Sequence, residues 1–372
     1  MGELKYLIRV YFVPGTATVV TRLVHRVTRS HSQFKLHCAT MGATAEVSET
    51  DEFKAKWLKH TCTVYGYLHL AALYGIYLIF TNSVQWKTLL WSFFLLQCGT
   101  VGITAGAHRL WCHRSYKAKM PLQIILVIMN SIAFMDTITN WVRYHRIHHK
   151  FVDTNGDPHN SNRGLFFSQF GWLLVQEHPD VTNKGKTIFM EDIHNNPLLR
   201  FQQKYSILVI GLWCYVIPTA VPMYFWGESF VNSWHICAML RHALTFNLIF
   251  LVNSVGHRWG NRPFDKNIKA VENTVVSVLS SGECFHNYHH VFPFDYKASE
   301  LGMTKFNAAT QFINFFAKFG WAYDLKTIPN DVIIARTKRT GGGKNLWGWG
   351  DQDQTDEETK NIELLYTFSK TA

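Results

Sequence analysis

Residues 141–150 form the stretch WVRYHRIHHK, which places three histidines within five positions, at His145, His148 and His149. On an α-helix, residues at i, i+3 and i+4 lie on one face, so the three imidazoles would point toward the same place. The chain already carries a formal net charge of +11, and basic residues flank the three histidines. A basic surface patch explains this stretch alone as well as a metal site does, so the other histidines decide between the two.

Two further clusters of histidines occur in the chain. The segment AHRLWCHR contains His108 and His113, and HNYHH repeats the HxxHH spacing at residues 286–290. A separate NSVGH segment ends at His257. Imidazole binds iron, zinc, copper and nickel, and one zinc ion uses only three or four ligands. The number of clustered imidazoles therefore favours two metal ions, whose charge an all-imidazole ligand set would not neutralise.

Four stretches of the chain are long and apolar enough to cross a bilayer, which takes about 20 residues. They cover residues 62–80, 89–107, 207–226 and 231–255. The short connection within each pair contains almost no Lys or Arg, whereas residues 108–206 and 256–372 are rich in both. The positive-inside rule then places both termini, both long segments and all the histidine clusters on the cytosolic side.

The expected fold class is an all-α integral membrane protein with four transmembrane helices in two hairpins. A cytosolic helical cap, formed by residues 108–206 and 256–335, would carry the metal site. The apolar run 121–135 is too short for a further span, so we expect it in the interface or against the bundle. The chain would divide into a basic cytosolic N-terminal segment, a membrane domain and a polar flexible tail, at residues 1–58, 59–335 and 336–372.

The composition excludes several other classes of protein. The chain of 372 residues is 47% hydrophobic and only 17% charged. Its seven cysteines are isolated and lack CxxC spacing, which is typical of reduced thiols and excludes a disulfide framework or an iron–sulfur site. The basic excess favours an anionic partner such as a phosphorylated substrate or a membrane surface. We expect no nucleic-acid partner.

The histidine clusters and their neighbours resemble the membrane acyl-CoA desaturases of the stearoyl-CoA type, above all their insect members. The segments that carry the resemblance include GITAGAHRLWCHRSYKAK, HRIHHK, DPHN, NSVGH and HNYHHVFPFDY, and it extends over roughly residues 60 to 350. It implies a di-iron (Fe2+) site in the cap, a narrow bent tunnel for the acyl chain and a location in the endoplasmic reticulum membrane. The implied ligands, with Asn253 holding a metal-bound water, are His108, His113, His145, His148, His149, His257, His286, His289 and His290.

The resemblance also implies the chemistry. Members of the family use O2 to remove two hydrogens from adjacent methylenes of a long-chain acyl-CoA, and here we expect a double bond at carbon 9 or carbon 11. Electrons come from NADH through NADH-cytochrome b5 reductase and cytochrome b5. No HPGG haem-domain motif occurs in the sequence, so cytochrome b5 is expected to be a separate partner. Double-bond geometry, chain length, substrate saturation and oligomeric state stay open.

The positions expected near the coenzyme A head group depart from the family pattern. The family usually has an Asp where this chain has Tyr144, directly after Arg143. A basic pair that contributes to head-group binding is replaced by Gln176 and Glu177. These four residues are the expected contacts of the head group, and their chemistry predicts an altered affinity for it.

The positions expected at the tunnel bend depart as well. Met135 and Asp136 stand where the family has Gln and Asn, and Ile249 and Phe250 stand where it has Thr and Trp. Trp141 is expected to line the same bend. Intact ligands beside changed substrate contacts predict altered regioselectivity or chain-length preference, with neutral drift in a paralogue of ordinary activity as the alternative.

Two other functions stay open on the sequence. A hydroxylase or a conjugating desaturase would use the same metal platform, whereas a non-catalytic metal- or lipid-binding membrane protein belongs to a different class. His69, inside the first apolar stretch, is expected to be a core histidine. His159, in GDPHN, is expected either to support a ligand or to lie in a turn.

Overall fold

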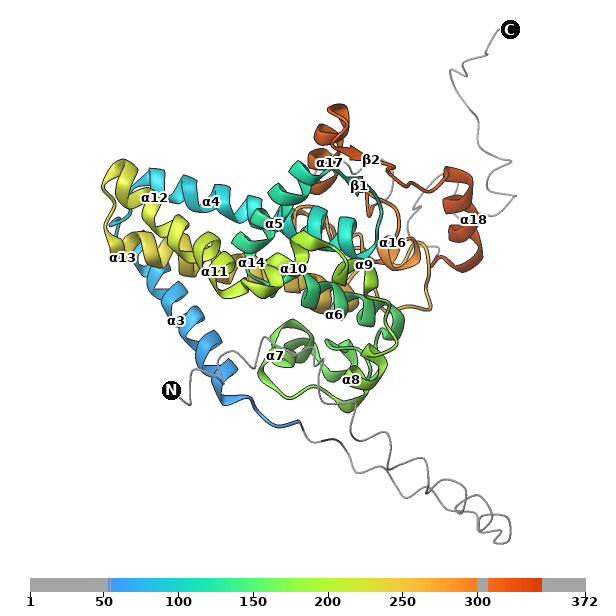
Figure 1. Ribbon diagram of the computed structural model, residues 1–372. Helices are drawn as coiled ribbons and strands as arrows, with labels where there is room; N and C mark the ends of the chain where they lie inside the picture. Colours follow the sequence, from blue (N-terminus) through green and yellow to red (C-terminus); the bar gives the residue numbers. More distant parts are fainter. Residues whose placement is uncertain (1–52, 54, 300–306, 343–372) are drawn as a thin grey trace, which may run out of the picture. The chain divides into compact units, whose positions relative to one another are not determined.

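The computed structural model describes residues 53, 55–299 and 307–342, so most of the predicted segment 1–58 and part of the predicted tail lie outside the described residues. Internal contacts divide the chain into two units, Met1–Lys54 and Ala55–Ala372. The regular secondary structure of the described part is helical except for one antiparallel pair of short strands, β1 (Lys117–Ala118) and β2 (Ala322–Tyr323). The predicted all-α class is confirmed (Figure 1).

Four helices of the described part are long and apolar enough to cross a membrane, as predicted. They are α3 (Lys59–Phe80), α4 with η2 (Trp86–Val101, Gly102–Cys112), α11 with η5 and α12 (Ser206–Ile210, Gly211–Val216, Ile217–Trp226), and α13 with η6, α14 and η7 (Phe230–Ser233, Trp234–Leu240, Arg241–Ser254, Val255–His257). The second helix runs five residues past the predicted end at residue 107, so it carries His108 of the first histidine cluster, and His113 follows directly after it. Its buried Arg109 is paired inside the protein, which lets a polar segment continue the apolar helix.

The two hairpins are joined at their short loops by Glu228. This buried carboxylate accepts hydrogen bonds from the backbone N–H of Gln85 at 3.0 Å and from the Thr88 hydroxyl at 2.7 Å. It also accepts one from the Asn232 side-chain amide at 2.9 Å. Glu228 therefore connects the start of α4 to the loop between α12 and α13. These segments lie at one end of the bundle (Figure 1).

Three of the four spans contain a π-helical stretch, η2, η5 or η6. Such wide turns free backbone carbonyls that need another donor inside a membrane. Arg241, which is fully buried, supplies it: its Nε donates to the Cys237 carbonyl at 3.0 Å and its other nitrogens donate to the carbonyls of Cys214 and Ile132. The charge in the middle of the fourth span thus holds three neighbouring segments together.

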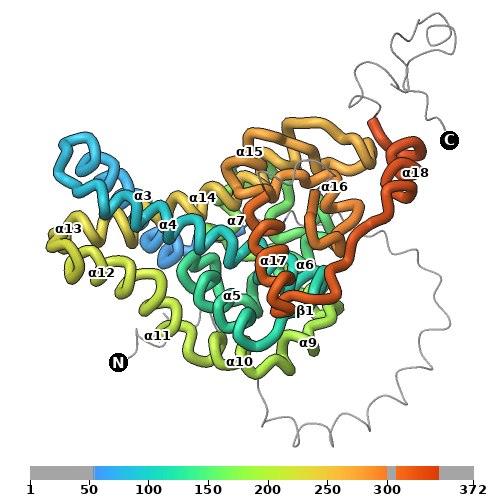
Figure 2. The backbone as a smooth tube through the Cα atoms, turned by 90° about the horizontal axis from the view of Figure 1, so that it is seen from above, coloured from blue at the N-terminus to red at the C-terminus, as the bar shows by residue number. Residues whose placement is uncertain are grey.

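The cap begins with a sharply bent pair of helices. The helix α5 (Met120–Ala133) packs against α4 and η2, as predicted for the apolar run 121–135 (Figure 2). It meets α6 (Ile138–Phe151) at an angle of 82°. Phe134 and Asp136 have positive φ values of 47° and 87°, which end α5 and redirect the chain. The bend turns α6 toward the histidines of η2.

The remaining elements complete the cap around the histidines. They are η3 (Ser161–Arg163), η4 (Phe167–Gly171), α7 (Trp172–Leu174), α8 (Pro179–Gly185), α9 (Glu191–His194), α10 (Pro197–Lys204), α15 (Thr274–Leu279), α16 (His286–Val291), α17 (Ala308–Lys318) and α18 (Asn330–Thr340). The expected domain boundary at residue 335 falls inside α18. The Arg336 side chain pairs with Asp265, and the backbone N–H of Gly342 donates to Arg262, so the first residues of the expected tail are held by the cap.

Replacing Glu228 tests the hydrogen bonds that connect the two hairpins. Glu228→Ala leaves the donors at Gln85, Thr88 and Asn232 without their acceptor, which we expect to cost about 1–3 kcal/mol of stability. Burial by itself raises the pKa of Glu228, but these hydrogen bonds bring it below its ordinary value of 4.5. The carboxylate therefore stabilises the fold above that pH, and the contribution is lost as the pH falls through the folded-state pKa. Thermal unfolding in detergent between pH 3 and pH 7 measures this, and a variant with the wild-type pH profile would contradict it.

Candidate metal centre

Nine histidines converge at the end of the bundle opposite the two short loops. They come from η2 and the residue that follows it, from α6, from η7 and from α16, which brings all three sequence clusters and the separate NSVGH histidine together. Their ligand atoms fall into two groups, each with all atoms within 4.8 Å of one another. The first group is His108, His113, His145, His149 and His289, and the second group is His148, His257, His286 and His290.

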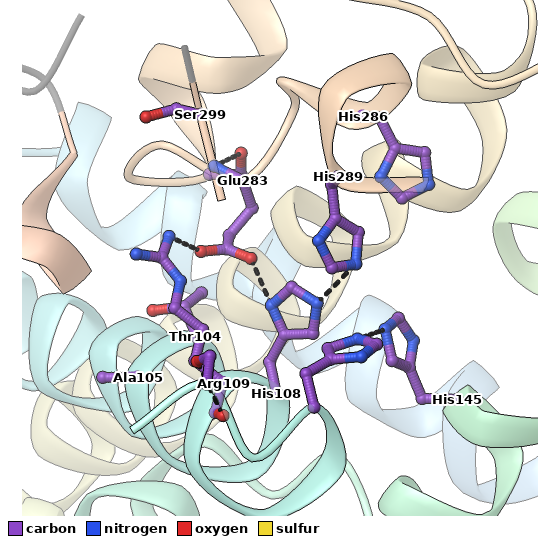
Figure 3. Close-up of polar contacts among 12 residues, drawn as sticks. Thr104, Ala105, His108, Arg109, His145, Glu283, His286, His289 and Ser299 are labelled. Carbon is purple, nitrogen blue, oxygen red and sulfur yellow. Dashed lines mark hydrogen bonds and ion pairs between the residues drawn. The ribbon is translucent and has the colours of Figure 1, made fainter. Parts of the chain in front are cut away.

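In the first group the Nε2 atoms face one another. His108 Nε2 lies 2.9 Å from His289 Nε2, which lies 3.0 Å from His149 Nε2. His145 Nε2 lies 3.1 Å from the Nε2 atoms of both His113 and His149. Figure 3 shows the rings of His108, His145 and His289 turned toward this common centre.

The second group is arranged in the same way. His286 Nε2 lies 2.9 Å from His257 Nε2 and 3.0 Å from His290 Nε2. His290 Nε2 in turn lies 3.3 Å from His148 Nε2. The HxxHH clusters are therefore each divided between the two groups, with His148 facing away from the group of its neighbours on α6.

These distances fit metal ions better than hydrogen bonds. Two nitrogens in adjacent positions around one ion, each about 2.1 Å from it, are about 3 Å apart. Neutral imidazoles have one N–H each and cannot hydrogen bond to several Nε2 atoms at once. Burial, and after it repulsion between the rings, lowers the pKa well below the ordinary 6.5 for His113, His145, His149, His286, His289 and His290. The rings are therefore neutral and able to bind metal.

Two buried carboxylates that were not part of the predicted site contact histidines of the two groups at Nδ1, the ring nitrogen that points away from the centre of the group. Glu283 Oε2 lies 2.6 Å from His108 Nδ1, and both carboxylate oxygens of Asp157 lie 3.0 Å from His148 Nδ1. Such partners orient metal-bound imidazoles. Both lie beside clusters in the sequence, in GECFH and GDPHN, which is the signal that could have found them. His159 is buried and lies in a turn, with its Nδ1 3.4 Å from Asp157. It lies outside both groups and forms with His148 and Asp157 a third set that could hold a metal ion.

Asn253 is half-buried on α14, four residues before His257. Its role in holding a metal-bound water stays a prediction.

The residues predicted at the tunnel bend come together beside the first group. Met135, Ile249 and Phe250 pack in one apolar cluster, and Trp141 packs against it. The Trp141 ring stacks on His145 with ring centroids 4.7 Å apart. An apolar surface therefore reaches the first group along one face.

Asp136 does not point into that cluster. Its carboxylate accepts from the Thr137 backbone N–H at 2.6 Å and from the Asn140 side chain at 3.0 Å. Burial raises the pKa of Asp136 to about 6 even though these bonds lower it. The residue shapes the turn between α5 and α6.

Two of the departures predicted near the head group, Tyr144 and Glu177, contact each other. The Tyr144 hydroxyl donates to the Glu177 carboxylate, although the two residues are separated in sequence by 32 others. The Arg143 guanidinium lies over the Tyr144 ring, 5.6 Å from its centroid. The Gln176 side chain is exposed, and its backbone N–H donates to the Lys56 carbonyl at 2.8 Å. Three of the four residues thus form one contact network between α6 and the chain before α8.

Comparison with known proteins gives the family. A family model described as fatty acid desaturase matches residues 84–306. The chain belongs to the fatty acid desaturase family. It is 57% identical over 299 residues to an acyl-CoA Delta(11) desaturase of Spodoptera littoralis, covering 80% of this chain and 88% of the relative. It is 52% identical to an acyl-CoA Delta-9 desaturase of Acheta domesticus (78% and 81% covered) and 54% identical to an (11Z)-hexadec-11-enoyl-CoA conjugase of Bombyx mori (78% and 89% covered).

Removing one imidazole of this fatty acid desaturase tests the first group. His289 lies against both His108 and His149, so we expect His289→Ala to lower the bound metal by about one ion per chain. His178→Ala is the control, because His178 caps α8 and lies outside both groups. Metal content by mass spectrometry of the purified proteins measures the effect. Equal metal in the two variants would contradict the assignment.

Proposed function

We propose that the chain is a multi-pass membrane acyl-CoA desaturase that introduces a double bond into a long-chain fatty acyl-CoA. The observation that carries this proposal is the pair of buried imidazole groups at the end of an apolar helical bundle. The printed names of the relatives, acyl-CoA desaturases and a conjugase of an unsaturated acyl-CoA, support the substrate class.

We propose that each group holds one iron ion. The nine histidines would be the ligands, and Asn253 would hold a metal-bound water. Bound iron would supply the oxidising power that unactivated C–H bonds require. Two hydrogens leave adjacent methylenes with two electrons, cytochrome b5 supplies two further electrons, the solvent supplies two protons, and one O2 becomes two waters.

The chain's own residues would fix which methylene reacts. Trp141 holds the His145 ring by stacking and joins the first group to the cluster of Met135, Ile249 and Phe250. An acyl chain bound along this surface would be shielded from water, and a displacement of about 1 Å would change the reacting carbon or the rate. We propose reaction at carbon 9 or carbon 11, with the apolar side chains at positions 135 and 249 altering the regioselectivity.

The setting of the enzyme follows from charge and topology. We propose the endoplasmic reticulum membrane from the resemblance to the family. We propose both termini and the cap in the cytosol because the long connections are basic and the short ones are not. Cytochrome b5, reduced by its NADH-dependent reductase, would be a separate partner. The net charge of +11 favours its approach and that of coenzyme A phosphates.

A conjugating desaturase is the second candidate, and the Bombyx mori relative named as a conjugase favours it. It would act on a chain that is already unsaturated. The same imidazole groups would serve, so the two candidates differ only in substrate.

Expression in a desaturase-deficient yeast tests the activity. We expect a new monounsaturated fatty acid, located by mass spectrometry of derivatised products, and none from His148→Ala, which removes a member of the second group. Feeding monounsaturated acids separates the conjugase. A hydroxy acid in place of an alkene would refute desaturation, and product from His148→Ala would refute the metal assignment.

Substitutions of Tyr144 and Glu177 test the proposed head-group contacts. Glu177 places a negative charge where the family has a basic pair, which would repel coenzyme A phosphates. We expect Glu177→Lys with Tyr144→Asp to lower the KM for acyl-CoA several-fold at low salt with little change in kcat. Glu191→Lys, on the exposed surface of α9, makes the same Glu-to-Lys exchange away from this network and is the control. Equal KM values for the two variants would place the head group elsewhere.

A further inference from the structure

Each group of imidazoles is backed by one buried carboxylate on an Nδ1 atom. Glu283 contacts His108 of the first group, and Asp157 contacts His148 of the second group. A carboxylate at Nδ1 keeps the proton on that nitrogen, so that the Nε2 lone pair faces the centre of the group. In Figure 3 the Glu283 carboxylate lies between His108 and Arg109.

The two carboxylates differ in their other partners. Glu283 also pairs with Arg109, whose guanidinium is buried beside it and permanently charged. Asp157 accepts instead from neutral donors, the backbone N–H groups of Asp153 at 2.9 Å and His159 at 3.1 Å. Within residues 53, 55–299 and 307–342, no lysine or arginine pairs with Asp157.

A second carboxylate increases this difference. Asp153 Oδ2 lies 3.7 Å from His257 Nδ1 in the second group, and the other oxygen of Asp153 accepts from the Ser161 hydroxyl. The second group is therefore backed by two carboxylates that have no cationic side chain as partner in the described part of the chain. Among the residues that the structure describes, one carboxylate, Glu283, backs the first group, and it is shared with Arg109.

This difference in charge has a chemical consequence for bound metal. Hydrogen bonding of Nδ1–H to a carboxylate makes the imidazole a stronger donor, and uncompensated negative charge stabilises the more oxidised ion. An arginine on the same carboxylate cancels much of that effect. Two ions held by five imidazoles in the first group and four in the second would then differ further in affinity and reduction potential.

We propose that Glu283 and Asp157 are positioning residues for His108 and His148, and that the uncompensated charge beside the second group makes its iron more firmly held and more easily oxidised than the iron of the first group. The inference rests on the proposed function, because it requires iron in both groups.

The full-length chain, purified in detergent and loaded with isotopically enriched Fe2+, provides the test. We expect two Mössbauer signals, two phases of iron loss to a chelator and two reduction potentials. The variants His113→Ala and His257→Ala each disturb one group and assign the signals. The slower phase and the lower potential should belong to the second group.

Two substitutions of Asp157 separate orientation from charge. Asp157→Asn retains an oxygen acceptor for His148 Nδ1–H and removes the charge, so both ions should stay. Its slow phase should become about 10- to 100-fold faster, and the two potentials should approach each other. Asp157→Ala removes the acceptor as well, and the second group should lose its ion.

Glu228→Gln is the control for loss of a buried carboxylate, because it lies at the opposite end of the bundle. It should lower thermal stability and leave both signals unchanged. Equal phases and potentials in the wild-type protein, or an Asp157→Asn protein identical to it, would overturn the inference. If Asp157→Ala fails to fold, Asp157→Asn still decides. A wild-type protein without iron or alkene product would instead refute the proposed function.

Discussion

The structure depends on keeping nine imidazoles close to one another at one end of an apolar bundle. Without bound metal, adjacent Nε2 lone pairs about 3 Å apart repel, so the surrounding protein must hold the rings in place. The extension of the second span to Cys112, the 82° bend before α6 and the carboxylates on Nδ1 atoms all serve this arrangement. At the other end, Glu228 joins the hairpins through ordinary hydrogen bonds.

The local parts of this arrangement were predictable from the sequence. Long apolar runs determine the spans, and HxxHH spacing determines which imidazoles share a helix face. The division of each HxxHH cluster between two groups was not predictable, because it depends on the rotation of α6 and α16 relative to two other elements. Asp157 and Glu283 stand beside histidine motifs in the sequence, but the histidine that each carboxylate contacts was not predictable, because only the tertiary fold brings Glu283 to His108.

The departures from the family pattern form contacts that a sequence comparison treats as separate positions. Tyr144 and Glu177 are far apart in the sequence, but the Tyr144 hydroxyl donates a hydrogen bond to the Glu177 carboxylate. Met135 and Ile249 are likewise distant and lie in one apolar cluster. An altered substrate site at these positions stays a prediction, with neutral drift in a paralogue as its alternative.

The helices α6 and α16 each supply histidines to both groups. His148 faces the second group while His145 and His149 face the first, and His289 faces the first while His286 and His290 face the second. The distance between the two groups therefore depends on the helical rise, about 1.5 Å per residue, along the two helices that they share. One inserted residue in either helix would rotate the residues beyond it by about 100° and misplace members of both groups together. Substitutions around one group can leave the other group unchanged, whereas an insertion in a shared helix displaces histidines of both groups.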